Sequence, residues 1–189
     1  MIITRTTDLS MTSQRKKKGT SRAELFLAND RLHAGFFSFK SDRCIEEWGV
    51  LREFEDSLAR EDEAFFFLPR HRGPNNDPPD CEAVDGRGSR IGIEVTEFVD
   101  SASVAAAHKR QRYDWKDWRL DLIPRLRERI REKDNPSDPK DPPYSEYVLL
   151  VYTDEPRLGF VRAREILAHH LFPATPLITR AYLLFSYVR

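Results

Sequence analysis

Residues 76–100, NDPPDCEAVDGRGSRIGIEVTEFVD, carry the pattern of two strands joined by a tight turn. The turn, DGRGS, contains an Asp-Gly step and a second glycine, which supply the positive φ angles that a hairpin loop requires. A turn centred on Arg87 places Asp80 seven residues before it and Glu94 seven residues after it. In that register the two carboxylates are directly opposed on one face of the sheet, with Cβ atoms about 5 Å apart. We therefore predict a β-hairpin that brings two acidic side chains together.

The register of this hairpin decides whether the two acids meet. Successive side chains of a strand alternate between the two faces of a sheet, so Thr96 shares the face of Glu94, and Ile93 and Val95 share the other face. A slip of one residue would move Asp80 and Glu94 to opposite faces. The site prediction therefore depends on the turn being centred as described.

Length and composition are those of one globular domain. The chain has 189 residues, of which 40% are hydrophobic, and this is long enough to bury a core. The sequence contains no apolar run of about 18 residues, so we expect no membrane span, and no apolar signal core near the start, which argues against secretion. Two cysteines, Cys44 and Cys81, make no disulfide framework and fit a reducing cytoplasm.

The remaining segments predict alternating helices and strands around the hairpin. Residues 1–22 are polar and basic, and we interpret them as a disordered arm, or as sequence upstream of an alternative start at Met11; residues 23–189 then form a single domain. The expected elements are a helix over 41–60, a buried strand over 64–69 that ends at Pro69, the hairpin, a long helix from about 100 to 133 that kinks or restarts at Pro124, a central strand over 146–154, a helix over 161–171 and a strand over 181–188. This order predicts an α/β sandwich with a mixed central sheet. The chain stops in or directly after a strand, which is consistent with a truncated frame.

The chemistry of the paired acids points to a metal ion. Glu94 lies within IGIEVT, where an inner strand favours apolar residues, so its charge requires a partner. In the alternative interpretation, Asp80 caps a turn after two prolines and Glu94 is exposed on the sheet. Two carboxylates and the carbonyl oxygen of Val95 would form a hard, oxygen-rich site that suits Mg²⁺ or Mn²⁺ rather than Zn²⁺.

These residues carry a resemblance to a known family. Pro79-Asp80, a gap of 13 residues and then Glu94-Val95-Thr96 after an apolar strand resemble the motif of the PD-(D/E)xK nuclease superfamily, whose fold is restriction-endonuclease-like. The resemblance covers roughly residues 44–153. It implies an α-β-β-β-α-β core, Asp80 and Glu94 as ligands of Mg²⁺ or Mn²⁺, and hydrolysis of phosphodiester bonds, with DNA preferred to RNA as the substrate. It also implies the homodimer that restriction-fold enzymes often form.

The chain departs from the family pattern at one position. The lysine that follows the family glutamate by two residues is Thr96 here, which brings no positive charge to orient water or to stabilise a pentavalent phosphate. Some branches of the family place an amine or an amide on the following helix, and Gln111 with Trp115 resembles their Q-x-x-x-Y pattern. An amide that hydrogen-bonds only to backbone is an equally good interpretation of Gln111, and Lys109 is the next candidate for the missing amine.

Further site residues are expected on the helices. The family often adds a glutamate from the helix before the sheet, and by analogy Glu47 is preferred to Glu55, although a solvated helix face explains these acids equally well. The basic residues expected to contact nucleic acid, or else to form a solvated face, are Lys109, Arg110, Arg112 and Lys116. Because the family lysine is absent, two alternatives stay open: a nucleic-acid-binding module that has lost cleavage, and an accessory protein of a defence system that acts through a partner.

Overall fold

A mixed seven-stranded sheet forms the centre of the molecule. The computed structural model describes residues 2–4, 23–24, 43–102, 105, 116–155 and 158–185. The strands follow the order β2-β1-β7-β6-β5-β4-β3 across the sheet. Their bounds are Ile2–Thr4 for β1, Ala23–Glu24 for β2, Phe67–His71 for β3, Cys81–Val84 for β4, Arg90–Glu97 for β5, Glu146–Thr153 for β6 and Arg180–Phe185 for β7. The described helices are α1 (Arg43–Arg60), α3 (Trp118–Lys133) and α4 (Phe160–Leu167).

The β4–β5 hairpin has the predicted register. The two strands are antiparallel, and Cys81 pairs with Ile93, so Asp80 and Glu94 stand opposite one another where β4 begins. The turn is held by Asp85, whose backbone N–H donates to the carbonyl of Ser89 at 2.9 Å. Gly88 adopts the positive φ of 81° that the turn requires. The Asp-Gly turn therefore sets the register as the sequence predicts.

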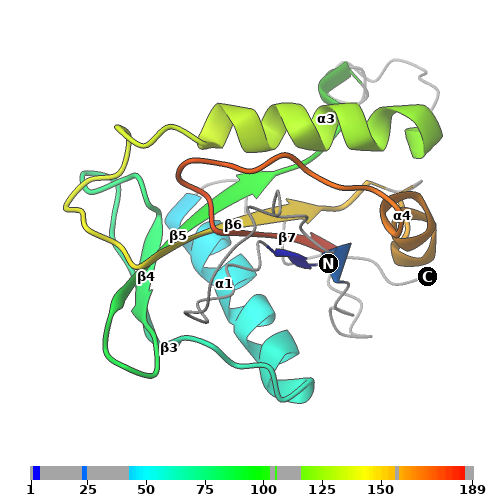
Figure 1. Cartoon of the computed structure of the whole chain (residues 1–189). Helices are drawn as coiled ribbons and strands as arrows, with labels where there is room; N and C mark the ends of the chain where they lie inside the picture. Colours follow the sequence, from blue (N-terminus) through cyan, green and yellow to red (C-terminus); the bar gives the residue numbers. More distant parts are fainter. Residues whose placement is uncertain are drawn as a thin grey trace, which may run out of the picture.

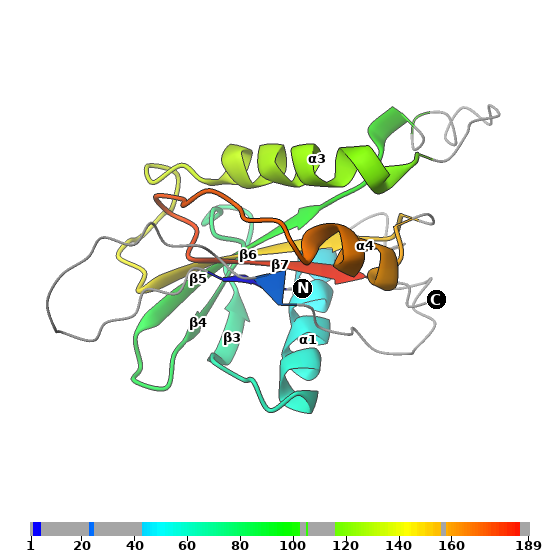
Figure 2. The ribbon, with the colours of Figure 1, turned by 45° about the vertical axis from the view of Figure 1, so that its right-hand side comes forward.

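The helices cover both faces of the sheet. β5, β6 and β7 run parallel, and the chain passes between them through α3 and α4. These two helices pack on one face through residues such as Leu126 and Leu167, and α1 packs on the other face through Leu51 and Phe54 (Figures 1 and 2). β6 is buried from Tyr147 to Thr153, as expected of a central strand with helices on both sides. The predicted α/β class with a mixed sheet is confirmed.

The predicted strand over 64–69 is wrong in its position and in its burial. β3 begins at Phe67 and continues through Pro69 to His71, and most of its side chains are exposed. The reason is that β3 is the edge strand of the sheet, where a proline without an N–H group is tolerated because no strand pairs with that side. Only Phe66, just before the strand, is fully buried.

The long helix predicted over 100–133, with a kink or restart at Pro124, is interrupted at a different place. Lys116 and Asp117 are not helical, and α3 begins at Trp118. The side chain of Asp117 accepts the N–H of Arg119 at 3.1 Å and so caps the helix. Pro124 lies inside α3 rather than at its start, and a new helix therefore begins at an N-cap residue and not at the proline.

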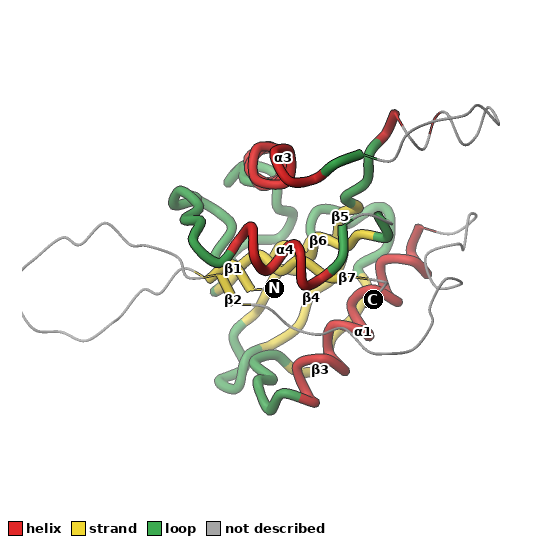
Figure 3. The backbone as a smooth tube through the Cα atoms, turned by 90° about the vertical axis from the view of Figure 1, so that its right-hand side faces the viewer, coloured by secondary structure: helices red, strands yellow, loops and turns green. Residues whose placement is uncertain are grey.

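The start of the chain belongs to the sheet. Ile2–Thr4 of the predicted disordered arm form β1, which pairs with β7 and with β2, and residues 5–22 lie outside the described part. β1 and β2 stand at the edge opposite β3, beside β7 (Figure 3). None of the helices in the described ranges is long and apolar enough to cross a membrane.

Candidate metal centre

Three carboxylates converge where β4 begins. Asp77, Asp80 and Glu94 each offer one oxygen atom, and these atoms lie within 4.8 Å of one another. Asp80 directly precedes β4, Glu94 lies in β5, and Asp77 comes from the loop between β3 and β4. The side chains of Asp80 and Glu94 are almost fully buried, since the two residues are 1% and 3% exposed. The two acids predicted from the hairpin register are therefore brought together, and a third joins them.

The backbone of β5 fixes the orientation of Asp80. The N–H of Val95 donates to Oδ2 of Asp80 at 2.7 Å. Val95 lies beyond the first residue of β4, so a side-chain carboxylate accepts the N–H that has no backbone partner in β4. The N–H and C=O of one residue of a strand point to the same side, so the Val95 carbonyl is directed to the side on which Asp80 lies. This direction is the one that the predicted third ligand requires.

Burial and like charge act against ionisation of this pair. Burial, followed by the neighbouring charge of Glu94, raises the pKa of Asp80 well above its usual range. Burial also raises the pKa of Glu94, and the ion pair with Lys133 partly opposes that rise. Two buried carboxylates at this separation are stabilised by a shared proton or by a cation between them.

A lysine reaches the cluster from α3. Lys133 Nζ lies 2.6 Å from Oε1 of Glu94, and the hydroxyl of Tyr147 donates to the other oxygen of Glu94 at 3.3 Å. Leu126 and Ile130 of α3 are buried in the core below the helix. Lys133 follows Ile130 by three residues and so lies on the same face of the helix. The packing of α3 therefore directs a primary amine at the acidic cluster.

An arginine reaches the cluster from α1. Arg43 Nη2 lies 3.2 Å from Asp80 Oδ1 and 3.4 Å from Asp77 Oδ2. The Nε–H of Arg43 donates to Glu47, the residue expected from the helix before the sheet. Glu47 also contacts Nε2 of His71 at 2.9 Å. Arg43 thus joins Glu47 to Asp77 and Asp80.

The tautomer of His71 follows from its two hydrogen bonds. The N–H of Gly73 donates to Nδ1 at 2.9 Å, so Nδ1 accepts and Nε2 carries the proton of the neutral ring. The Nε2–H group then donates to Glu47. His71 holds Glu47 in place without adding a charge.

The charge balance and the donor atoms fit a divalent cation. Four carboxylates (Asp77, Asp80, Glu94 and Glu47) share two basic side chains, Arg43 and Lys133. With all four ionised, the group carries an excess of two negative charges, which one divalent ion would neutralise. The donors are carboxylate oxygens and a carbonyl oxygen, the ligands that Mg²⁺ and Mn²⁺ prefer. The residues present therefore fit the ion that the sequence predicts.

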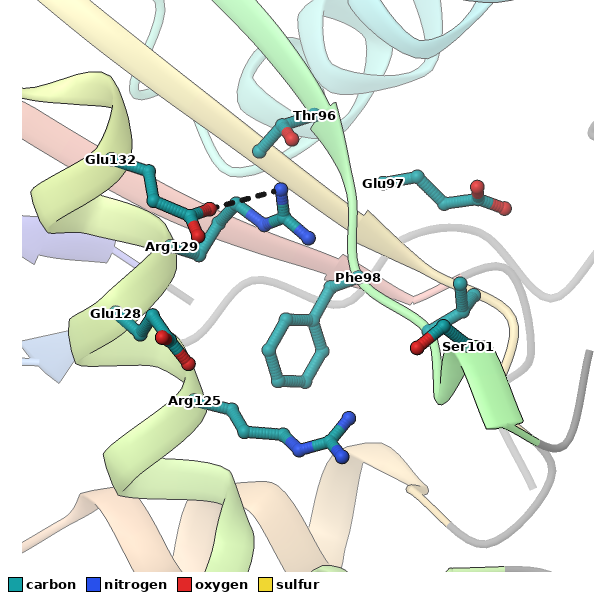
Figure 4. Close-up of a pocket in the computed structure, with 9 residues that line it drawn as sticks. Thr96, Glu97, Phe98, Ser101, Arg125, Glu128, Arg129 and Glu132 are labelled. Carbon is teal, nitrogen blue, oxygen red and sulfur yellow. Dashed lines mark ion pairs between the residues drawn. The ribbon is translucent and has the colours of Figure 1, made fainter.

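Thr96 lies beside the cluster but faces a different cavity. It shares the face of Glu94 on β5 and is buried. It lines a cavity of about 500 Å³ between β5 and α3, together with Arg125, Arg129 and Glu132 (Figure 4). In Figure 4 the Arg129 side chain extends between α3 and β5 and pairs with Glu132.

The basic residues predicted for nucleic-acid contact lie apart from the cluster or outside the described ranges. Lys116 pairs with Asp121 at 2.5 Å and stands next to the first turn of α3. Lys133 is at the other end of this helix, about 22 Å away along the axis at 1.5 Å per residue. Lys109, Arg110, Gln111 and Arg112 lie outside the residues that the structure describes.

Three residues at the cluster were not predicted from the sequence, and two of them leave a signal in it. Lys133 continues the apolar stripe of Leu126 and Ile130, where a charged residue is unexpected. Asp77 is the first acid of the DPPD step that leads into β4. Arg43 precedes Glu47 by four residues, which places both on one face of α1, but nothing in the sequence distinguishes this pair from a surface ion pair.

Comparison of this chain with models of known protein families, with curated proteins and with solved structures gave no match.

Proposed function

We propose that this chain is a metal-dependent nuclease that hydrolyses phosphodiester bonds of DNA on a restriction-endonuclease-like fold. The observation that carries the proposal is the convergence of Asp77, Asp80 and Glu94 with the amine of Lys133. The order of elements supports the finer fold assignment, since α1, β3, β4, β5, α3 and β6 follow one another as in the α-β-β-β-α-β core of the PD-(D/E)xK pattern.

The acidic residues would hold the ion. The carboxylates of Asp77, Asp80 and Glu94 and the carbonyl of Val95 are the ligands that we assign to Mg²⁺ or Mn²⁺. Such an ion, when bound, polarises a phosphodiester oxygen and lowers the pKa of an attacking water. The protein holds the ligands rigidly, because Asp80 is fixed by the Val95 N–H and Glu94 by Tyr147.

Lys133 supplies the charge that Thr96 does not. In the family pattern a lysine two residues after the glutamate orients the water and stabilises the charge that develops on phosphorus. The amine of Lys133 lies 2.6 Å from Glu94, so it occupies the neighbourhood in which that lysine would act, although it comes from α3. A fixed cation at this place lowers the energy of the pentavalent phosphate. The alternative of a module that has lost cleavage depended on a missing amine, and Lys133 weakens it.

Arg43 provides a second cation at the cluster, beside Asp77 and Asp80 rather than Glu94. Its side chain contacts Asp77 and Asp80 and is 66% exposed, so donor groups remain directed to solvent. A guanidinium group has five N–H donors and can bind a phosphate oxygen with the groups that the two carboxylates leave free. We assign Arg43 to the binding of the phosphate that is attacked.

The test is hydrolysis of supercoiled plasmid by the purified full chain. With Mg²⁺ or Mn²⁺ we expect nicked and linear products, with EDTA none, and with Glu94→Gln a loss of at least about 100-fold because a ligand is removed. Glu165→Gln, on the exposed surface of α4, is the matched control and should retain the parent rate. Cleavage that persists unchanged in Glu94→Gln would show that the activity comes from elsewhere and would overturn the proposal.

A further inference from the structure

An apolar groove runs along the start of α1, beside the candidate metal centre. It has a volume of about 480 Å³ and is lined by Cys44, Ile45, Trp48, Pro69, Arg70 and His71. Ile45 is 53% exposed although it is a large apolar residue. Ligand pockets are lined mainly by apolar and aromatic side chains, as most of this groove is.

The groove is connected to the acidic cluster through the side chains of Glu47 and Arg43. His71, in its wall, contacts Glu47 at 2.9 Å, and Glu47 accepts from Arg43, whose guanidinium lies 3.2 Å from Asp80. Cys44 is the residue next to Arg43 in α1. The groove therefore begins one residue along α1 from the arginine that we assign to phosphate binding.

One residue that lines the groove, Arg70, belongs to a group of three arginines around Glu82. Arg70 is 73% exposed and donates to the buried carboxylate of Glu82. Arg72 and Arg90 contact the same carboxylate, at 3.4 and 3.0 Å. The carboxylate of Asp141 pairs with Arg72, and the backbone carbonyl of Asp141 accepts from Arg90. Three arginines thus share two acidic side chains, Glu82 and Asp141, which leaves an excess of one positive charge. The guanidinium of Arg70 is exposed, although it also donates to Glu82.

We propose that the groove binds an unpaired nucleobase of the substrate, so that the preferred substrate is single-stranded DNA or a single-stranded end. A nucleotide has an apolar ring and a charged backbone. The groove offers an apolar surface for the ring, with an exposed arginine in its lining and the proposed phosphate-cleaving centre nearby. In a duplex the bases are paired and stacked inside, and the groove would remain empty. This inference rests on the proposed function for the identity of the substrate, but it concerns binding and is tested without turnover.

The test uses anisotropy of a fluorescein-labelled oligonucleotide, single-stranded or annealed to its complement. The full chain carries Asp80→Asn so that nothing is cleaved, and salt is held constant because phosphate contacts depend on it. We expect the single strand to bind at least about tenfold more tightly than the duplex, in line with the contribution of one bound base. Ile45→Glu should abolish most of this preference.

Leu120→Glu is the matched control for Ile45→Glu. Leu120 is 86% exposed on α3, so the same substitution there should change neither affinity. Both variants alter exposed residues, and equal melting temperatures would show that both fold. Arg70→Gln should weaken binding of the single strand and reduce the slope of log affinity against log salt by about one, as expected for one lost phosphate contact.

The inference would be overturned if duplex DNA bound as tightly as the single strand, or if Ile45→Glu and Leu120→Glu had equal effects on binding. It would also be overturned if light scattering gave Ile45→Glu a different molecular mass from the parent, because another protein chain would then fill the groove. The proposed function fails separately. If the parent binds single-stranded DNA as expected but does not hydrolyse it, only the proposed nuclease activity is refuted. If duplex DNA is hydrolysed at the same rate by the parent and by Ile45→Glu, and the single strand is not preferred, only the groove proposal is refuted.

Discussion

Replacing Asp80 by asparagine should stabilise the metal-free protein while removing its response to metal. The side chain is 1% exposed, and burial together with the charge of Glu94 raises its pKa. Asparagine keeps the shape, and its oxygen can still accept the N–H of Val95 that now bonds to Oδ2 at 2.7 Å. The substitution therefore removes the ionisable group and retains the hydrogen bond that orients the residue.

The magnitude follows from proton linkage. With a raised pKa, the folded chain keeps a proton on Asp80 at pH values where the unfolded chain has lost it. The free energy of unfolding then falls as pH rises, by about 1.4 kcal/mol per pH unit for one proton, or about 2.7 kcal/mol from pH 5 to pH 7. Asparagine does not titrate, so the variant loses nothing over this range. For a domain of this size about 2–4 °C of melting temperature correspond to 1 kcal/mol. The difference in melting temperature between the variant and the parent should therefore increase by about 5–11 °C between pH 5 and pH 7.

The assay is thermal unfolding followed by circular dichroism at pH 5 and pH 7, with EDTA or with excess Mg²⁺. Metal at about 100 times its dissociation constant should stabilise the parent by about 2.7 kcal/mol and the Asp80→Asn variant not at all. Glu165→Gln, exposed on α4, should follow the parent in every condition. A variant that melts below the parent at pH 7 in EDTA, or that gains as much from Mg²⁺ as the parent does, would refute the reasoning.

Three further predictions test the surroundings of the cluster. Lys133→Met should slow hydrolysis of DNA by about 10²–10³-fold without weakening Mn²⁺ binding measured by calorimetry, and an unchanged rate would remove Lys133 from the proposed mechanism. Gly92→Ala should cost about 1–3 kcal/mol of stability in chemical denaturation, because an added Cβ would lie 2.9 Å from the ring of Tyr147; Gly159→Ala, where nothing lies within 4 Å, is its control, and equal losses would contradict the packing argument. Mn²⁺ binding at pH 7 should release protons, since the pKa of Asp80 is raised and the ion binds the ionised form; calorimetric heats that are identical in buffers of different ionisation enthalpy would show that no proton is released.

The hairpin could be predicted because its determinants are local. An Asp-Gly turn fixes the pairing, and alternation along β5 then fixes the face of every side chain. Asp80 and Glu94 were found in this way, and their register is the one that the structure shows. The central strand β6 was equally clear, since its apolar run is long and uninterrupted.

The basic half of the site could not be predicted because it depends on packing. Lys133 is separated from Glu94 by 39 residues, and their contact requires that α3 cross the sheet at one particular angle and register. The sequence favoured Gln111 as the replacement for the missing lysine, because Gln111 is closer to the hairpin along the chain. β3 was misplaced for a related reason: its apolar residues suggest burial, but its place at the edge of the sheet exposes Phe67 and Leu68.

The most direct test of the account is a crystal of the full chain soaked in Mn²⁺ and measured for anomalous scattering. The account predicts one strong peak between Asp77, Asp80 and Glu94, in contact with the carbonyl of Val95, and no peak there in Asp80→Asn crystals. A map in which Mn²⁺ binds elsewhere, while the three carboxylates stay joined to Lys133 and Arg43, would contradict it.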